Sequence, residues 1–413
     1  MSGEHKLLTG MRVLDVTNYL SGPFASLLLA GLGAEVIKVE RPGIGDPCRW
    51  NPPFANPGGI SFEQKSEEDI SLIFLKRNRS KKSISLNLQS EKGREIFKEL
   101  VPRVDVVLEN FTPGVMGRLG LGYEGLKGLN PKLIYCSISG FGQSGPYTGY
   151  QAFDLVVQAM SGVMAITGEE GGPPMRCGFL LGDQSAALFA TVGILSATIE
   201  RQKTGKGRAI DVSMQAGLFS MIMDDTWELV LAEGLPVRTG NRIARLAPFS
   251  VYAAQDGYVV ICTASDEQWQ NVLRAMGRED LKEDPRYCTS ASRVKNVQEV
   301  EALVGNWMRE KSTQEALDGL RKNRVACSPV LEIQDVLQDG QLKHRGMMVD
   351  LTHPVYGKIH GVTGAGFPIR YSEMNVQYDQ PAPRLGEQNE EIYSGLLGYD
   401  REKISQLKGE GII

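Results

Sequence analysis

One carboxylate stands out in the segment RCGFLLGDQSAALFA, which spans residues 176–190. Asp183 lies between an apolar run and the start of an apolar helical pattern, and ionised carboxylates are rarely buried without a partner or a chemical task. As a structural residue, Asp183 would be the N-cap of the helix that begins with QSAALF. The same place would keep a carboxylate ionised beside amides that could stabilise an oxyanion. Asp183 is therefore both a predicted cap and a candidate nucleophile.

Histidine is informative because of where it is missing. The histidines are His5, His344, His353 and His360, so residues 12–220 contain no imidazole. A Ser–His or Cys–His nucleophile inside that region is excluded. The six cysteines form no C-x-x-C pair, so we expect reduced thiols and no zinc or other metal site.

A literal G-x-G-x-x-G motif occurs at Gly120, Gly122 and Gly125, but it joins two helical segments and does not follow a strand. A dinucleotide-binding loop needs a strand that delivers the glycines to a helix N-terminus. The position of this motif therefore argues against a nicotinamide-dependent oxidoreductase. We keep that function only as an alternative behind the two given at the end of this section. Walker, H-E-x-x-H and G-x-S-x-G motifs are also missing from the sequence.

Length and charge limit the function classes. A chain of 413 residues predicts two domains, or a large domain with a smaller insertion. The net charge is −4, with 45 basic and 49 acidic residues spread along the chain, which disfavours nucleic-acid and membrane-surface partners. The first residues do not resemble a signal peptide and no apolar run would span a bilayer, so we expect a cytoplasmic protein.

The first two hundred residues alternate between β-branched apolar runs and helical periodicity, which predicts an α/β fold of βα units around a mostly parallel sheet. Predicted strands include MRVLDVT, AEVIKVE, SISLNL, VDVVLEN and KLIYCSISGF, and helices are predicted at 152–164, 184–201 and 214–233. Near residue 234 the composition changes to Gly, Pro and Arg. A hairpin on the Asp256–Gly257 turn and a capped helix then begin a second unit.

Two arginines and one basic cluster could bind an anion. Arg41 directly follows the second predicted strand, at the carboxyl edge where open α/β sheets bind ligands. Arg118 and the cluster RNRSKK near residues 77–82 could contact phosphates, although charged loops are more often simply solvated.

Several motifs occur in an order that resembles one family. They are MRVLDVT, SGPF, LGAEVIKVERPGIGD, VLENFTPGVMGRLGLGY, NPKLIYCSISGFGQSGPY, LLGD, KTGKGR and APRLGE. Together they resemble the class III coenzyme A transferases, the family of formyl-CoA transferase and of the carnitine-pathway CoA-transferase. The resemblance extends over nearly the whole chain.

The resemblance implies a large Rossmann-like domain made from both chain ends, residues 1–225 and 329–413, with a smaller α+β domain inserted at 226–328 and two chains interlocked as a dimer. It makes Asp183 the catalytic residue. It also implies coenzyme A contacts for the residues that match the family's motifs, namely Arg41, Leu86, Asn87, Asn110, Phe111, Thr112, Arg118, Gln151 and Phe153.

In the chemistry that the resemblance implies, the carboxylate attacks an acyl-CoA thioester, and an anhydride and then an enzyme–CoA thioester form on the aspartate. Acyl-CoA and coenzyme A are substrates, a free carboxylic acid is the acceptor, and no cofactor is tightly bound. The amides of Gly182 and Gln184 are the predicted oxyanion donors.

Departures from the family pattern bear on the substrate. Leu20 stands where the formyl-CoA type has a glutamine, and no glycine-run lid occurs between 240 and 260, so a larger acid is favoured over formate or oxalate. Leu20 and Phe153 would suit an apolar or aromatic acyl group, and succinyl-CoA is a candidate donor.

Two alternatives from the same fold stay open. An α-methylacyl-CoA racemase would need a histidine in the stretch GYQAFDL at 149–155, which has none. The chain could also be the non-catalytic partner in a heterodimer of related subunits, although its LGD motif at 181–183 is intact.

Overall fold

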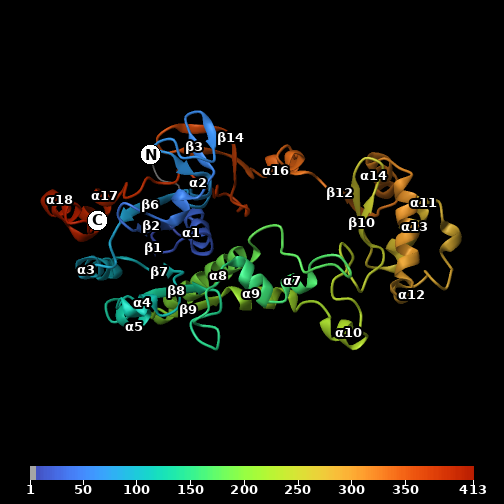
Figure 1. Ribbon diagram of the computed structural model, residues 1–413, viewed down its shortest axis with the longest axis horizontal. Helices are drawn as coiled ribbons and strands as arrows, with labels where there is room; N and C mark the ends of the chain where they lie inside the picture. Colours follow the sequence, from blue (N-terminus) through green and yellow to red (C-terminus); the bar gives the residue numbers. More distant parts are fainter. Residues whose placement is uncertain (1–5) are drawn as a thin grey trace. The chain divides into compact units, whose positions relative to one another are not determined.

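The computed structural model describes residues 6–413, which divide into two units (Figure 1). The first unit contains residues 6–161, 178–221 and 340–413, and the second contains 162–177 and 222–339. The predicted division at 225/226 and 328/329 into separately folding domains stays a prediction.

A parallel sheet of six strands forms the centre of the first unit, in the order β6-β2-β1-β7-β8-β9. The strands are β1 (Arg12–Asp15), β2 (Glu35–Glu40), β6 (Lys81–Ser85), β7 (Val106–Glu109), β8 (Ile134–Ser139) and β9 (Ala209–Ser213). Numbered along the chain, this is the 3-2-1-4-5-6 order of doubly wound sheets, so the predicted α/β class and parallel sheet are confirmed. The strand order reverses between β1 and β7, which is where such sheets bind ligands.

The two faces of this sheet pack against different helices. Leu14 belongs to a hydrophobic core shared with α3 (Glu91–Leu100) and with the C-terminal helices α17 (Asn389–Leu397) and α18 (Arg401–Gly409), which return beside α3 (Figure 1). The next residue, Asp15, accepts a hydrogen bond from Ser26 of α1 (Ser21–Gly31). Because neighbouring residues of a strand point to opposite faces, α1 covers the other side. The long helix α8 (Leu181–Thr204) packs against α1.

Shorter elements complete the first unit. They are η1 (Pro47–Trp50), the small sheet of β4 (Gly59–Ser61), β3 (Phe54–Asn56) and β5 (Ile70–Ser71), α2 (Leu72–Arg77), η2 (Val101–Arg103), α4 (Val115–Arg118), α5 (Tyr123–Leu126), α6 (Asp154–Met160), α9 (Met214–Ile222), α16 (Gly340–His344), and the hairpin of β13 (Met348–His353) and β14 (Gly357–Ala365).

The second unit has its own hydrophobic core. The predicted hairpin is confirmed as antiparallel β10 (Phe249–Ala253) and β11 (Tyr258–Cys262), and the predicted helix behind it is α11 (Asp266–Met276), capped by Ser265. The other elements are α7 (Val163–Ile166), α10 (Trp227–Ala232), η3 (Glu279–Leu281), α12 (Ser290–Lys295), α13 (Val297–Arg309), α14 (Thr313–Lys322), β12 (Ala326–Pro329) and α15 (Ile333–Val336).

Two predicted helices are wrong in their length. The helix predicted at 152–164 is divided into α6 and α7 because Gly162 adopts φ 97°, which a continuing right-handed helix does not allow. The helix predicted at 214–233 is likewise divided into α9 and α10.

Buried ion pairs lie beneath α1, on the face of the sheet that α1 covers. The Lys38 ammonium is fully buried, lies 2.9 Å from Asp46 Oδ2 and donates a hydrogen bond of 2.7 Å to the Thr17 carbonyl. Lys81 similarly lies 3.2 Å from Asp15 Oδ2. The nearby carboxylates raise the pKa of Lys38 despite the opposing effect of its burial, so the ammonium stays charged. A side chain of β2 thus fixes the first residue of the connection between β1 and α1.

We expect Lys38→Met to lower the free energy of unfolding by about 3–5 kcal/mol, because it leaves Asp46 buried without its counter-charge. Lys82→Met is the matched control: Lys82 lies on the neighbouring strand, pairs with Glu35 and Glu391, and is about one-third exposed, so its loss should cost less than about 1 kcal/mol. Urea denaturation at pH 7 measures both. Equal, small losses would show that the Lys38 pair does not stabilise the fold.

Candidate active site

Asp183 is the third residue of α8, whose N-cap is Leu180 with no side-chain cap. The prediction that Asp183 is itself the N-cap is therefore wrong, because the helix begins at Leu181. The capping carboxylate comes from another helix: Asp154 Oδ1 accepts hydrogen bonds from the amides of Gly182 (2.7 Å) and Asp183 (3.2 Å). These are amides that a helix cannot satisfy internally. The Asp183 side chain is thus left out of the cap.

Asp154 is the first residue of α6 and is only 4% exposed. Its second oxygen accepts a 2.6 Å hydrogen bond from the side-chain amide of Gln158, one turn further along α6. Both oxygens of this buried carboxylate are therefore engaged. Asp154 was not predicted as a site residue, because an acidic residue in the first turn of a helix is common and nothing local identifies its distant partner.

The Asp183 carboxylate is half-buried, and its environment raises its pKa to about 6. Burial is the largest cause, followed by the negative charge of Asp154. The Arg77 guanidinium and hydrogen bonds from the hydroxyl and backbone N–H of Ser21 act in the opposite direction. Asp183 is therefore mainly ionised at pH 7, but it is more basic than an exposed aspartate.

Ser21 is the first residue of α1, so the amide that it directs at Asp183 belongs to a helix N-terminus. Asp183 itself lies in the first turn of α8. Two helix N-termini thus meet at one carboxylate, and the positive ends of both helix dipoles favour negative charge there. The sequence analysis missed Ser21, although the SGP that opens α1 directly after a strand and loop was a usable signal.

Residues 17–20 form the connection that carries Ser21, and we call it the β1–α1 loop. The Asn110 side chain, which follows β7, accepts from the Asn18 amide (2.9 Å) and donates to the Asn18 carbonyl (2.8 Å) and to Ser21 Oγ (3.2 Å). This pairing joins the connections after β1 and β7, on the two sides of the point where the strand order reverses. The loop is therefore tied to the sheet on its β7 side.

Other side chains hold Tyr19 in the same loop. Its amide donates to Asp46 Oδ1 (3.2 Å), and its carbonyl accepts from Arg77 Nη1 (3.0 Å) and from Cys48 Sγ (3.2 Å). These contacts support a backbone φ of 65°, which a residue with a side chain seldom adopts. The ring of Tyr19 meets that of Phe153 edge to face at 6.0 Å.

Four predicted site residues have other roles in the structure. The Gly182 amide is occupied by Asp154, and the Gln184 amide donates to the Leu180 carbonyl (3.1 Å), so neither is free for an oxyanion. Leu86 is 2% exposed in the hydrophobic core, which removes its side chain from any ligand. The side-chain amide of Asn110 is used by the β1–α1 loop and is not available to coenzyme A.

The remaining predicted contacts lie near the carboxyl edge of the sheet, because they follow parallel strands. Arg41 follows β2, Asn87 follows β6, Phe111 and Thr112 follow β7, and Gln151 and Phe153 lie between β8 and α6, while Arg118 ends α4. Asn87 and Phe111 are half-buried, and the others are exposed. Leu20 is the N-cap of α1 and is buried, directly before Ser21.

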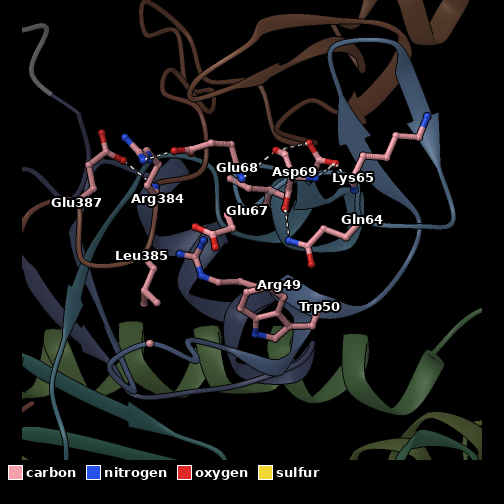
Figure 2. A pocket seen from close by; sticks show the side chains of 13 residues that line it. Arg49, Trp50, Gln64, Lys65, Glu67, Glu68, Asp69, Arg384, Leu385 and Glu387 are labelled. Carbon is pink, nitrogen blue, oxygen red and sulfur yellow. Dashed lines mark hydrogen bonds and ion pairs between the residues drawn. The ribbon is translucent and has the colours of Figure 1, made fainter.

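A separate cavity of about 940 Å³ is shown in Figure 2. Its arginines are already paired: Arg384 contacts Glu68 at 2.7 Å, and Arg49 contacts Glu40 at 2.7 Å. Neither Asp183, Asp154 nor Ser21 lines it. The cavity is therefore separate from the candidate catalytic residue.

Within residues 6–413 no group of three or more His, Cys, Asp or Glu side chains could hold a metal ion. In the same part of the chain, no helix has both the length and the apolar character needed to cross a membrane.

The chain is similar to known proteins over almost its full length. The model of a family described as CoA-transferase family III matches residues 8–389. Succinyl-CoA:glutarate CoA-transferase of Mus musculus is 35% identical over 409 residues, which cover 99% of this chain and 90% of that protein. Formyl-CoA:oxalate CoA-transferase of Streptomyces coelicolor is 35% identical over 426 residues, with 99% of each covered.

Among solved structures, a CAIB/BAIF family protein from Brucella suis matches with a TM-score of 0.80 and 35% identity, and the match covers 95% of this chain and 100% of that one. The resemblance found in the sequence motifs is thus confirmed by the family match and by full-length relatives: the chain belongs to CoA-transferase family III.

Proposed function

We propose that this CoA-transferase moves coenzyme A from a donor acyl-CoA to a free carboxylic acid through covalent intermediates on Asp183. The proposal depends on one observation: the half-buried Asp183 carboxylate lies at two helix N-termini, and its pKa is raised to about 6. Asp154, and not Asp183, caps α8. A carboxylate acts as a nucleophile when it is ionised at neutral pH and its negative charge is not fully stabilised by its surroundings.

The reaction has two symmetrical halves. An Asp183 oxygen attacks the thioester carbonyl of the donor, which forms a mixed anhydride and expels the CoA thiolate. The thiolate attacks the aspartyl carbonyl, which releases the donor acid and leaves an enzyme–CoA thioester. The acceptor carboxylate attacks that thioester and again expels the thiolate. The thiolate then attacks the acceptor's acyl carbonyl, which gives the new acyl-CoA and restores Asp183.

Each attack on a carbonyl develops negative charge on oxygen. The Ser21 hydroxyl and amide, which hydrogen-bond to the Asp183 carboxylate, are better oxyanion donors than the occupied amides of Gly182 and Gln184. They would stay beside the same oxygens when Asp183 is acylated. Removal of a single donor of this kind typically lowers kcat by about 10²–10³.

Coenzyme A would lie along the carboxyl edge of the sheet. Arg41 and Arg118 are exposed and form no ion pair within residues 6–413, as expected of cations that bind phosphate groups. Asn87, Phe111, Thr112, Gln151 and Phe153 are the further proposed contacts. The Tyr19–Phe153 ring pair would form an apolar wall beside Asp183.

A second chain would complete the enzyme. Leu188, Val192 and Ile199 lie on α8 with exposed fractions of 50%, 60% and 57%, and such an apolar stripe indicates a covered surface. We propose an interlocked homodimer, with a related but different chain as the alternative partner. Full-length relatives that are CoA-transferases support a catalytic chain.

We infer the substrate class from the substrates that the relatives' names give. Those named above act on succinyl-CoA with glutarate and on formyl-CoA with oxalate, and another, from Haloarcula hispanica, acts on succinyl-CoA with mesaconate. We propose succinyl-CoA as donor and a dicarboxylic acid as acceptor. The stretch from Gly149 to Leu155 contains no histidine, so the alternative proton transfer of a racemase would lack its base.

Incubation with succinyl-CoA should add coenzyme A covalently to Asp183, because the first half of the reaction stops there without an acceptor. Intact-mass spectrometry before borohydride treatment detects the added coenzyme A. Peptide mapping after borohydride, which releases coenzyme A and leaves an alcohol at residue 183, locates the site. Asp183→Ala should show no adduct and no turnover while its thermal unfolding stays close to that of the parent. Turnover by Asp183→Ala would contradict the mechanism.

The rate should depend on pH through Asp183. As pH falls through about 6, protonation removes the nucleophile, so kcat/KM for the donor should decline. Asp154→Asn removes a negative charge that raises the Asp183 pKa and can still accept the two amides, so the acidic limb should move to lower pH. An unchanged limb in Asp154→Asn would show that another group controls the profile.

Asn110→Ala should separate positioning of the β1–α1 loop from binding of coenzyme A. Displacement of Ser21 should lower kcat by about 10²-fold with little change in KM for the acyl-CoA. Arg118→Gln, the comparison variant, should mainly raise that KM. The reverse pattern in Asn110→Ala, a raised KM with normal kcat, would identify Asn110 as a ligand contact.

A further inference from the structure

Arg77 forms no ion pair with an acidic side chain within residues 6–413. It ends α2 and is half-buried. Two other buried cations of the first unit are paired, Lys38 with Asp46 and Arg49 with Glu40, whereas Arg79 donates to the Ala365 carbonyl and lies over the Tyr378 ring. A partly buried, unpaired guanidinium is costly to keep, so an anion that binds only with the substrate would account for it.

The guanidinium faces the reaction site through the β1–α1 loop. Its Nη1 donates to the Tyr19 carbonyl at 3.0 Å, two residues before Ser21, which hydrogen-bonds to Asp183. The charge of Arg77 also acts on the Asp183 carboxylate itself. An acyl group joined to Asp183 as an anhydride would therefore lie near the Arg77 guanidinium.

Most donors of Arg77 are unused. Nη1 contacts the Tyr19 carbonyl and, at 3.4 Å, Cys48 Sγ, while Nε and Nη2 make no hydrogen bond within residues 6–413. A guanidinium has five N–H donors in a planar fork that matches a carboxylate in two hydrogen bonds. The hydrogen bond to the Tyr19 carbonyl would orient the guanidinium and leave its other N–H donors available.

We propose that Arg77 binds the second carboxylate of a short dicarboxylic acyl group and thereby selects dicarboxylic over monocarboxylic substrates. The proposal rests on the covalent role of Asp183 and deepens it, because it assigns the substrate class to a named residue. The acyl carbonyl is held at Asp183 while the distal carboxylate reaches the guanidinium.

Two other roles of Arg77 predict different kinetics. A brace for the β1–α1 loop would affect every substrate alike, because it acts through Ser21 and Asp183. A contact for a coenzyme A phosphate would affect all acyl-CoA donors alike, whatever their acyl group. Only a receptor for the distal carboxylate distinguishes two acceptors that differ in that group alone.

The test compares glutarate with valerate, and adipate with hexanoate, as acceptors of matched length. In a reaction with a covalent intermediate, kcat/KM for the acceptor reports the second half-reaction alone, so succinyl-CoA can serve as donor throughout. The parent enzyme should prefer each dicarboxylic acid over its partner. Arg77→Gln should lower kcat/KM for both kinds of acid, because it also loosens the β1–α1 loop, but the loss should be about 100-fold larger for the dicarboxylic acids.

Lys76→Gln is the matched control, because it removes the same charge from the neighbouring, exposed residue and should leave the preference unchanged. Arg77→Lys keeps the charge but not the fork and should recover part of the preference. Equal losses for both acids in Arg77→Gln, or an unchanged preference, would overturn the proposal.

Covalent labelling separates this proposal from the proposed function. A parent enzyme that forms the Asp183–CoA adduct but shows no preference for dicarboxylic acids contradicts only the role of Arg77. A parent enzyme that forms no adduct from succinyl-CoA, yet turns substrates over, contradicts the covalent route itself.

Discussion

The site depends on one physical constraint, the placement of the β1–α1 loop by charges and amides that reach it from neighbouring strands. Lys38 holds its first carbonyl, Asn110 pairs with Asn18, and Asp46 and Arg77 hold Tyr19 in a conformation that an isolated chain would avoid. The doubly wound order makes this possible, because it places the ends of β2, β1 and β7 side by side. Ser21 is in this way delivered to Asp183 by the sheet and not by local sequence.

Two carboxylates have different roles at the start of α8. Asp154 is buried, accepts the helix amides and holds Gln158, so its negative charge is compensated by hydrogen bonds. Asp183, which would otherwise cap its own helix, remains available for chemistry. The same arrangement sets its basicity, because the uncompensated part of the Asp154 charge, together with burial, raises the Asp183 pKa to about 6.

Periodicity and motif order predicted the parallel sheet, the hairpin and helix of the second unit, the family and Asp183 as the candidate nucleophile, because these are recorded in residues close together in the chain. The start of α8 was predicted three residues late, since the carboxylate that caps it belongs to Asp154, which lies 29 residues before Asp183 in the chain. The same error made the amides of Gly182 and Gln184 look free. Asn110 was predicted to contact coenzyme A, whereas its side chain pairs with Asn18, which is 92 residues away, and such pairings cannot be predicted without the fold.

In the proposed reaction the charge of the site changes from step to step, so Asp154 and Arg77 would matter at different steps. Before the first attack Asp183 is an anion, and Asp154 prevents it from being too stable to react. As the proposed enzyme–CoA thioester, Asp183 would carry no charge, while Asp154 would still accept the α8 amides and the Arg77 guanidinium would still lie nearby. The site then has a net attraction for the anionic acceptor at the step in which that acceptor must displace the thiolate. An uncompensated cation beside a nucleophile that loses its charge is therefore what a transferase acting on acids requires.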